Sequence, residues 1–134
     1  MITVERATTG DRGAWDAFVA ARSEADLLQL WAWGEAMAVA GQPPLRLVAR
    51  DGDGAVRGLA QALVRPTAFG RPVLYAGHGP VWDRGADDGA AVLAALVDGL
   101  RSAARDHFGI VVKVDPAAAR IGDDDGVAVA AAVL

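Results

Sequence analysis

The sequence predicts an α/β domain in which a mixed, mostly antiparallel sheet is flanked by helices. Stretches with strand-like alternation or β-branched apolar runs are interleaved with stretches whose apolar residues recur at helical spacing. Glycine and proline stand between most of these stretches and mark turns. The chain has 134 residues, of which 53% are hydrophobic, enough to form one core. We therefore expect a single domain over residues 1–134 with the element order β-α-α-β-β-β-α-β.

One strand and two helices are predicted for the first third of the chain. Residues Ile2–Arg6 alternate as a strand does. Thr9 or Asp11 can cap a helix that ends near Arg22. A second helix is expected over Leu27–Ala40, because a glycine and two prolines follow it. The apolar face of the first helix consists of Trp15, Phe18 and Val19.

A hairpin and a short strand are predicted next. Leu45–Arg50 and Val56–Arg65 are rich in strand-forming residues, and Asp51–Gly54 supplies the turn between them. Val73–Tyr75 is a short apolar strand, which we expect to be buried. It leads into the glycine-rich segment Ala76–Pro80.

A long helix and a last strand complete the prediction. The helix covers Asp87–Asp106, with acidic residues at its start and arginines near its end, as the helix dipole favours. Ile110–Val114 follows as a strand closed by Asp115–Pro116. The tail Ala117–Leu134 is the least determined segment. The apolar positions of the helix are Leu93, Leu96, Val97, Leu100 and Ala104.

Composition excludes several classes of function. Cysteine is absent, which excludes disulfides and thiolate metal sites and agrees with a cytoplasmic setting. The formal net charge is −4 and Lys113 is the only lysine, so no basic face for autonomous tRNA or DNA binding is visible. No signal peptide or membrane-length apolar run is present. The acidic turns Asp51–Gly54 and Asp123–Gly126 lack the full ligand spacing of a calcium loop, so we expect solvated turns and no metal. Ser23 and Ser102 have no nucleophile elbow around them.

Three segments carry a family resemblance. They are "LLQLWAWGEAMAVAG" (Leu27–Gly41), "LYAGHGPVWD" (Leu74–Asp83) and "VVKVDP" (Val111–Pro116), with the predicted hairpin between the first two. In this order and spacing they resemble the N-terminal, GNAT-like domain of the Fem (FemABX) family of peptidoglycan-bridge aminoacyltransferases. The resemblance covers most of the chain, and none of the three segments is a catalytic signature.

The resemblance implies a transferase reaction in cell-wall (peptidoglycan) biosynthesis. In that family an amino acid passes from aminoacyl-tRNA to the peptide of a nucleotide- or lipid-linked precursor, without a cofactor. Family members normally have two such domains, and the first lines the precursor cleft. We therefore expect this chain to be the precursor-binding half, inactive alone and engaging aminoacyl-tRNA only with a second domain. The catalytic residues are not predicted.

The segment around the helix tryptophans departs from the family pattern. Relatives that bind the precursor's phosphates place a lysine just after the tryptophan, whereas here Trp33 is followed by Gly34 and Glu35. A carboxylate repels a pyrophosphate. Either the phosphate contact is lost, or another cation such as Arg65 or Lys113 supplies it, and the sequence leaves both open.

The substrate-binding candidates lie in or beside these segments. His78 stands between two glycines, at a place where acyltransferase-like folds open their sheet, and is a candidate for binding rather than for catalysis. Trp33 shares a helix face with Gly34, which we expect to rest on the sheet, although its indole N–H can reach a cleft. The full set of candidates is Trp33, Arg65, Tyr75, His78, Gly79 and Lys113.

Two alternative functions remain. A small CoA-dependent N-acyltransferase needs a glycine-rich phosphate turn, but Arg84–Gly89 places Asp87 and Asp88 where a dianion would bind, which disfavours CoA. A non-catalytic interaction module is favoured by the apolar tail Val127–Leu134, which predicts self-association as a homodimer.

Overall fold

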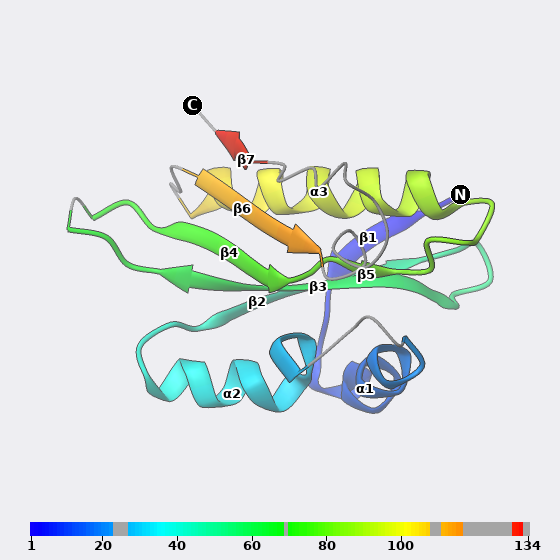
Figure 1. Cartoon of the computed structure of the whole chain (residues 1–134), viewed down its shortest axis with the longest axis horizontal. Coiled ribbons are helices and arrows are strands. Elements are labelled where there is room, and N and C mark those ends of the chain that lie inside the picture. Colours follow the sequence, from blue (N-terminus) through cyan, green and yellow to red (C-terminus); the bar gives the residue numbers. More distant parts are fainter. Residues whose placement is uncertain (23–26, 69, 108–110, 117–129, 133–134) are drawn as a thin grey trace.

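The computed structural model describes residues 1–22, 27–68, 70–107, 111–116 and 130–132, and it has three layers (Figure 1). Helices α1 (Arg12–Ala20) and α2 (Trp31–Val39) lie on one face of a central sheet, and α3 (Gly89–Asp106) lies on the other. Two short 3-10 turns, η1 (Thr9–Asp11) and η2 (Leu27–Gln29), precede α1 and α2. The strands are β1 (Thr3–Arg6), β2 (Pro44–Arg50), β3 (Val56–Arg65), β4 (Val73–His78), β5 (Val81–Trp82), β6 (Val111–Pro116) and β7 (Ala130–Ala132).

The sheet is mixed and mostly antiparallel, which confirms the predicted fold class. Within the described residues its order is β1-β2-β3-β4-β6-β7, and β5 pairs with β3 beyond the end of β4. Only β4 and β6 run parallel, because α3 connects them across one face of the sheet. The other pairs are antiparallel.

The predicted hairpin forms β2 and β3, and its acidic turn closes it. Oδ1 of Asp51 accepts hydrogen bonds from the backbone N–H groups of Asp53 and Ala55, at 2.9 and 3.0 Å. Gly54 adopts a positive φ of 82°, which suits glycine. Asp51 therefore acts as a turn residue, as expected. The turn Asp123–Gly126 lies outside the described residues.

The long helix is confirmed and covers the main core. It begins at Gly89, with Asp88 at the N-cap position, two residues later than Asp87. Its apolar stripe packs on β-strand residues of the same face. The most deeply buried members of this core are Ala49, Ala60, Ala62, Leu74, Ala76, Leu96, Leu100, Ala104, Val92 and Val112.

The second predicted helix is shorter than expected. The prediction of one helix over Leu27–Ala40 is wrong at its start, because Leu30 is extended (ψ 147°) and separates η2 from α2. The break lets the side chain of Gln29 enter the sheet, where it is fully buried. The backbone N–H of Trp31 then donates to Oδ1 of Asp16 in α1 at 2.9 Å, which caps the new helix start.

The first helix has Asp11, one of its two predicted caps, at its N-cap position, and a 3-10 turn precedes it. The N-cap of η1 is Thr8 rather than Thr9, and its backbone N–H donates to Oδ2 of Asp11 at 2.8 Å. Asp11 occupies the N-cap of α1 but makes no side-chain cap hydrogen bond there. Trp15 and Val19 are buried as predicted, and Phe18 is half-buried.

The glycine-rich segment after Tyr75 continues the strand instead of ending it. β4 extends to His78, and it stays in register with β6 up to the pair His78 and Pro116. The strands β4 and β6 are therefore still paired at His78, the place where acyltransferase-like folds open their sheet. Backbone hydrogen bonding persists one residue further, where the N–H of Asp115 donates to the carbonyl of Gly79 at 3.1 Å.

Two expectations concern membranes and the tail. No helix among the described residues has the length and apolar character needed to cross a bilayer. Residues 117–129 and 133–134 lie outside the described part, so the predicted role of the apolar tail in self-association stays a prediction. Only Ala130–Ala132 of the tail is described, as a strand paired with β6.

Candidate functional site

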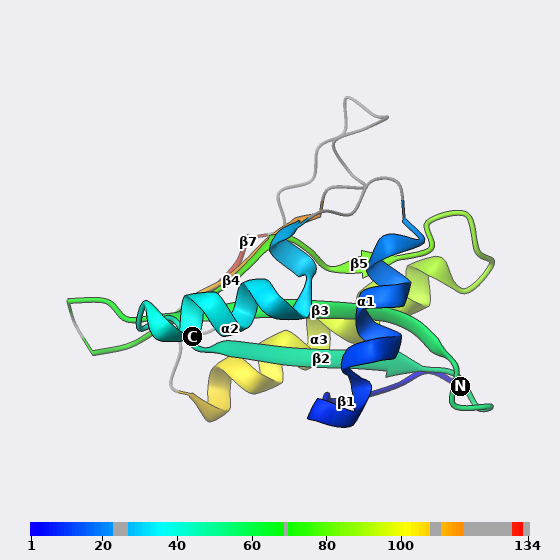
Figure 2. The same ribbon diagram turned by 90° about the horizontal axis from the view of Figure 1, so that it is seen from below.

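The helices α1 and α2 cover only part of their face of the sheet. Figure 2 shows them over β2 and β3, with β4 and β6 to one side. Tyr75 on β4 is in register with Leu63 on β3 and with Lys113 on β6, so these three side chains project from the same face. Neighbouring residues such as Leu74 and Val112 project to the opposite face and pack in the α3 core. The part of this face that the described helices leave uncovered, called the open face below, therefore carries Tyr75 and Lys113.

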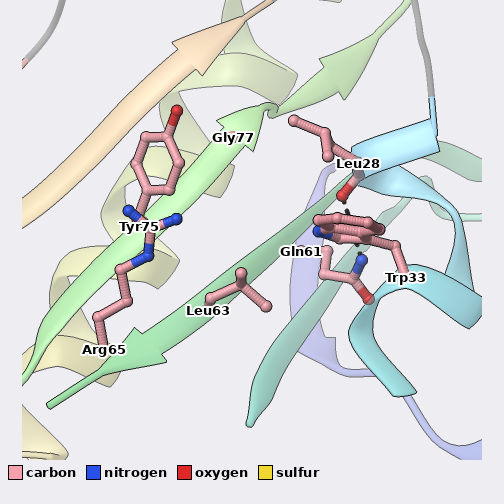
Figure 3. A pocket seen from close by; sticks show the side chains of 7 residues that line it. All are labelled: Leu28, Trp33, Gln61, Leu63, Arg65, Tyr75 and Gly77. Carbon is pink, nitrogen blue, oxygen red and sulfur yellow. Dashed lines mark hydrogen bonds between the residues drawn. The ribbon is translucent and has the colours of Figure 1, made fainter. Parts of the chain in front are cut away.

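A pocket lies beside α2, at the edge of the part of the sheet that this helix covers. Its volume is about 60 Å³, enough for one small chemical group rather than a whole ligand. Figure 3 shows Tyr75 and Arg65 on one side of it and Trp33 on the other, with Leu63 between them. The lining residues are Leu28, Trp33, Gln61, Leu63, Arg65, Tyr75 and Gly77.

The side-chain amide of Gln29 is buried between β3 and β4 beneath this pocket. The strands β3 and β4 pair only from Leu63 to Arg65, and further along they separate. The Gln29 side chain fills the separation: its Nε2 donates to the carbonyls of Gln61 (3.1 Å) and Gly77 (2.8 Å), and its Oε1 accepts from the Gln61 N–H (2.9 Å). The amide thus replaces missing strand-to-strand hydrogen bonds.

The α2 wall of the pocket is held by Arg46 of β2. Its guanidinium stacks 3.7 Å from the centroid of the Trp31 ring, donates to the Trp31 carbonyl at 2.9 Å, and donates through Nε to Oε1 of Gln61 at 2.9 Å. Its Nη2 also lies 3.2 Å from Oε1 of Glu35. Burial lowers the pKa of the Arg46 guanidinium, and the Glu35 carboxylate opposes that shift. Arg46 is therefore a structural cation whose donors are used within the fold.

Gly34 is required by this arrangement. A Cβ at Gly34 would lie 2.6 Å from Nη2 of Arg46 and 2.9 Å from Cδ of Gln61. The helix therefore approaches β2 and β3 more closely than any other residue type allows. This finding agrees with the expectation that the Gly34 face rests on the sheet. Trp33, one position earlier, is half-buried and faces the pocket.

The sheet wall of the pocket carries two cations that share one aromatic ring. The Arg65 guanidinium carbon lies 4.3 Å from the centroid of Tyr75, and Nζ of Lys113 lies 5.4 Å from it. Both distances are within the range of cation–π attraction. Nε of Arg65 donates to Oε1 of Gln42 at 2.9 Å. Among the described residues no carboxylate forms an ion pair with Arg65 or Lys113.

The structure groups four of the six predicted binding residues. Trp33, Arg65 and Tyr75 line the pocket, and Lys113 flanks the Tyr75 ring. His78 and Gly79 are not among the pocket-lining residues. His78 is half-buried in a left-handed conformation (φ 54°). Gly79 is buried against Gln29, where a Cβ would lie 2.5 Å from Cδ of that side chain, and it precedes a cis peptide bond to Pro80.

Sequence reasoning did not identify the residues that hold the pocket together. Gln29, Arg46 and Gln61 have no motif. A signal was present in that each glutamine stands between apolar neighbours, in Leu-Gln-Leu and in Ala-Gln-Ala. A glutamine in such a run is buried only with partners for its amide. That signal suggests a buried polar contact but does not say with which strand.

The turn before α3 shows why a CoA-type phosphate site is disfavoured. Several of its backbone donors are used internally: the N–H of Gly85 donates to Oδ1 of Asp83 at 3.0 Å, and that of Ala86 to the Asp83 carbonyl at 3.2 Å. The Gly89 N–H donates to the Ala86 carbonyl at 3.0 Å. Asp88 itself binds Arg57 through two hydrogen bonds of 3.0 and 2.7 Å, so the nearby cation is neutralised.

Comparisons with known proteins agree with this architecture. No protein-family model and no curated protein matches the sequence. Among solved structures, FemX is 29% identical, with a TM-score of 0.72, over 85% of this chain and 27% of FemX. The chain thus spans about a quarter of the length of FemX.

Acetyltransferases share the fold at lower identity. A probable acetyltransferase is 15% identical, with a TM-score of 0.67, over 94% of this chain and 83% of its own. The Escherichia coli GNAT family N-acetyltransferase YhbS, solved in complex with CoA, is 21% identical, with a TM-score of 0.63, over 90% and 67% of the two chains. The sheet order, the three layers and the likeness to FemX lead to one conclusion: the chain is a GNAT-like domain related to the Fem family.

Proposed function

We propose that this domain is the precursor-binding half of a peptidoglycan-bridge aminoacyltransferase. In this role it binds an anionic nucleotide- or lipid-linked cell-wall precursor on the open face of β4 and β6, beside the pocket under α2. The transfer of an amino acid from aminoacyl-tRNA requires a second domain. The likeness to FemX, of which this chain spans 27%, supports this division of labour.

The observation that carries the proposal is the chemistry of the pocket walls. Trp33 offers an indole N–H, Arg65 a guanidinium and Lys113 an ammonium, all of which only donate hydrogen bonds. Figure 3 shows the nitrogen end of the Trp33 indole directed toward Tyr75 across the pocket. These three groups donate hydrogen bonds, and two of them are cations. They therefore favour a ligand rich in acceptor oxygens and negative charge.

Calorimetry with a UDP-linked muramyl pentapeptide tests the proposal. We expect saturable binding at micromolar to millimolar ligand, because one domain supplies only part of the cleft. Trp33 reports the same event by fluorescence, since Trp15, Trp31 and Trp82 are buried at 1%, 3% and 7% exposure. The emission change should be lost in Trp33→Phe. If a folded sample gives neither heat nor an emission change at millimolar ligand, the proposed binding function is wrong.

A further inference from the structure

The strand β1 forms one edge of the sheet, and some of its backbone groups have no neighbouring strand to pair with. Within the described residues β1 pairs only with β2, and Figure 2 shows it at the border of the sheet. The N–H of Ala7 donates to the carbonyl of Arg46 at 3.0 Å, so these two residues form a hydrogen-bonded pair of the antiparallel ladder. Such pairs alternate along a strand. The N–H and C=O groups of Val4 and Arg6 therefore point away from β2, toward the unpaired edge.

A groove of about 330 Å³ lies between β1 and α3. Among its lining residues are Ile2 and Val4 on the strand side and the small residues Ala95, Gly99 and Ser102 of α3. A Cβ at Gly99 would lie 2.9 Å from Cγ1 of Val4, so the glycine lets the helix approach the strand. On the α3 face the edge is therefore apolar, and the helix residues next to it are small.

The charged side chains of β1 do not protect this edge against pairing with another strand. Edge strands are often protected by a lysine, a proline or a bulge. The segment Thr3–Arg6 contains neither lysine nor proline, and its register with β2 is continuous. The Glu5 carboxylate accepts from Nε of Arg50 at 2.9 Å, and Nη2 of Arg6 lies 3.4 Å from Nε2 of His107 at the end of α3. Both charged side chains of the strand therefore contact groups of their own chain.

The side-chain pattern of β1 favours one register in which two copies of this edge can pair. In an antiparallel pair of identical strands, residues directly opposite each other project from the same face. A register centred on Glu5 places two carboxylates opposite each other, and one centred on Arg6 places two guanidinium groups opposite each other, which is unfavourable. A register centred on Val4 places valine opposite valine on the α3 face and Thr3 opposite Glu5. Of these three registers, only the one centred on Val4 keeps like charges apart.

We propose that a second copy of this chain adds its own β1 beside this edge, in the antiparallel register centred on Val4. The hydrogen-bonded pairs are then Val4 with Val4, and Arg6 with Ile2 on each side of the two-fold axis. The apolar side chains of Ile2 and Val4 from both copies meet on the α3 face, beside the groove. The two sheets join into one continuous sheet, and both open faces lie on the same side of it. This interface does not depend on precursor binding.

Sedimentation velocity over a range of concentrations, combined with amide hydrogen exchange, tests the interface. We expect a monomer–dimer equilibrium in which the exchange of the Val4 and Arg6 amides slows as the concentration rises. The Thr3 and Glu5 amides already face β2, so their exchange should depend little on concentration. A monomer at every concentration would overturn the proposal, and the edge would then fit a strand of a different protein. A dimer in which the Val4 and Arg6 amides exchange as fast as in the monomer would also overturn it, in favour of the apolar tail Val127–Leu134.

Two opposite substitutions at Thr3 separate the interface from the stability of the single chain. In the proposed register Thr3→Glu faces Glu5 of the second copy and should weaken dimerisation about threefold to tenfold, whereas Thr3→Lys should strengthen it by a similar factor. Within one chain Thr3 is opposite Arg50, so Thr3→Glu should raise the urea midpoint of the monomer and Thr3→Lys should lower it. Thr9→Glu, at an exposed position outside β1, is the matched control and should leave the dissociation constant within twofold. Equal weakening by Thr3→Glu and Thr9→Glu would overturn the register, since only net charge would then act.

Discussion

Glu35 Oε1 lies 3.2 Å from Nη2 of Arg46, so the acidic residue of α2 is paired with a cation of the adjacent strand β2. The side chain of Arg46 is 11% exposed and that of Glu35 is 57% exposed. The pair therefore joins the outer surface of α2 to a nearly buried guanidinium. Glu35 belongs to the scaffold of the pocket wall and does not point a free negative charge into the pocket.

Glu35→Gln tests this interpretation. Because Arg46 already balances the carboxylate, the substitution should change the affinity for the UDP-linked muramyl pentapeptide less than twofold. It should lower the free energy of unfolding by no more than about 1 kcal/mol, as expected for a partly exposed ion pair. Calorimetry and urea denaturation measure the two quantities. A tenfold gain in affinity would mean that Glu35 repels the ligand after all.

Gly34→Ala should destabilise the domain. The new methyl group would lie 2.6 Å from Arg46 Nη2, so the guanidinium or the helix must move. We expect a loss of about 1–3 kcal/mol, as for other overpacked sites, even though alanine favours helices. Gly13→Ala in α1 is the matched control, since a Cβ there meets no atom within 4 Å. The control should be neutral or slightly stabilising in urea denaturation.

Gln29→Ala should be among the most destabilising single changes. It removes the amide that joins β3 to β4 and leaves the Gln61 N–H and the Gly77 carbonyl buried without that partner. We expect a loss of about 3 kcal/mol or more from the unpaired groups and the cavity. Gln42→Ala, at a more exposed position, should cost less than about 1 kcal/mol. Similar losses in both variants would contradict the bridging role.

Stability should decline in acid partly through Asp88. Hydrogen bonding to Arg57 holds the pKa of Asp88 below its ordinary value of 3.8. A carboxylate with a lower pKa in the folded state stabilises the fold above the unfolded pKa, and that stabilisation is lost as pH falls through the folded value. Asp88→Asn, which keeps a good N-cap residue, should therefore flatten the dependence of the urea midpoint on pH below about 4.

Acetyl-CoA should not bind at the start of α3. The Gly85, Ala86 and Gly89 N–H groups donate within the turn, and Asp88 binds the guanidinium of Arg57, so that cation does not face a phosphate. We expect no thermal shift with millimolar acetyl-CoA and no acetylation of amine substrates. A saturable shift that Asp88→Asn strengthens would instead favour the small N-acyltransferase alternative.

The sequence predicted elements wherever local chemistry decides the structure. The hairpin turn at Asp51, the end of α2 shortly before Gly41 and the apolar stripe of α3 follow from short-range patterns. The break at Leu30 and the extension of β4 to His78 do not, because distant partners impose them. Gln29 leaves the helix to satisfy strand groups that are thirty or more positions away in the chain.

Four residues of the candidate site were predictable from the sequence, but its other members and its geometry were not. Trp33, Arg65, Tyr75 and Lys113 were named from a resemblance and from charge. Their convergence depends on the register of β3, β4 and β6, which single residues do not encode. His78 and Gly79 follow Tyr75 directly in the chain, yet the Gln29 contact and the left-handed turn separate their role from that of the pocket.

The separation of β3 from β4 divides the sheet into two parts. The first part contains β1, β2, β3 and β5, and the second contains β4, β6 and β7. In the described residues three backbone pairs, the Gln29 amide, the contact of Arg65 with the Tyr75 ring and packing on α3 connect the two parts. Trp33 of α2 lies on the side of the first part, and Tyr75 of β4 belongs to the second. A ligand that binds both residues would restrain the movement of β4 relative to β3. Ligand binding should therefore slow amide hydrogen exchange in β4 and β6, including at residues that the ligand does not contact.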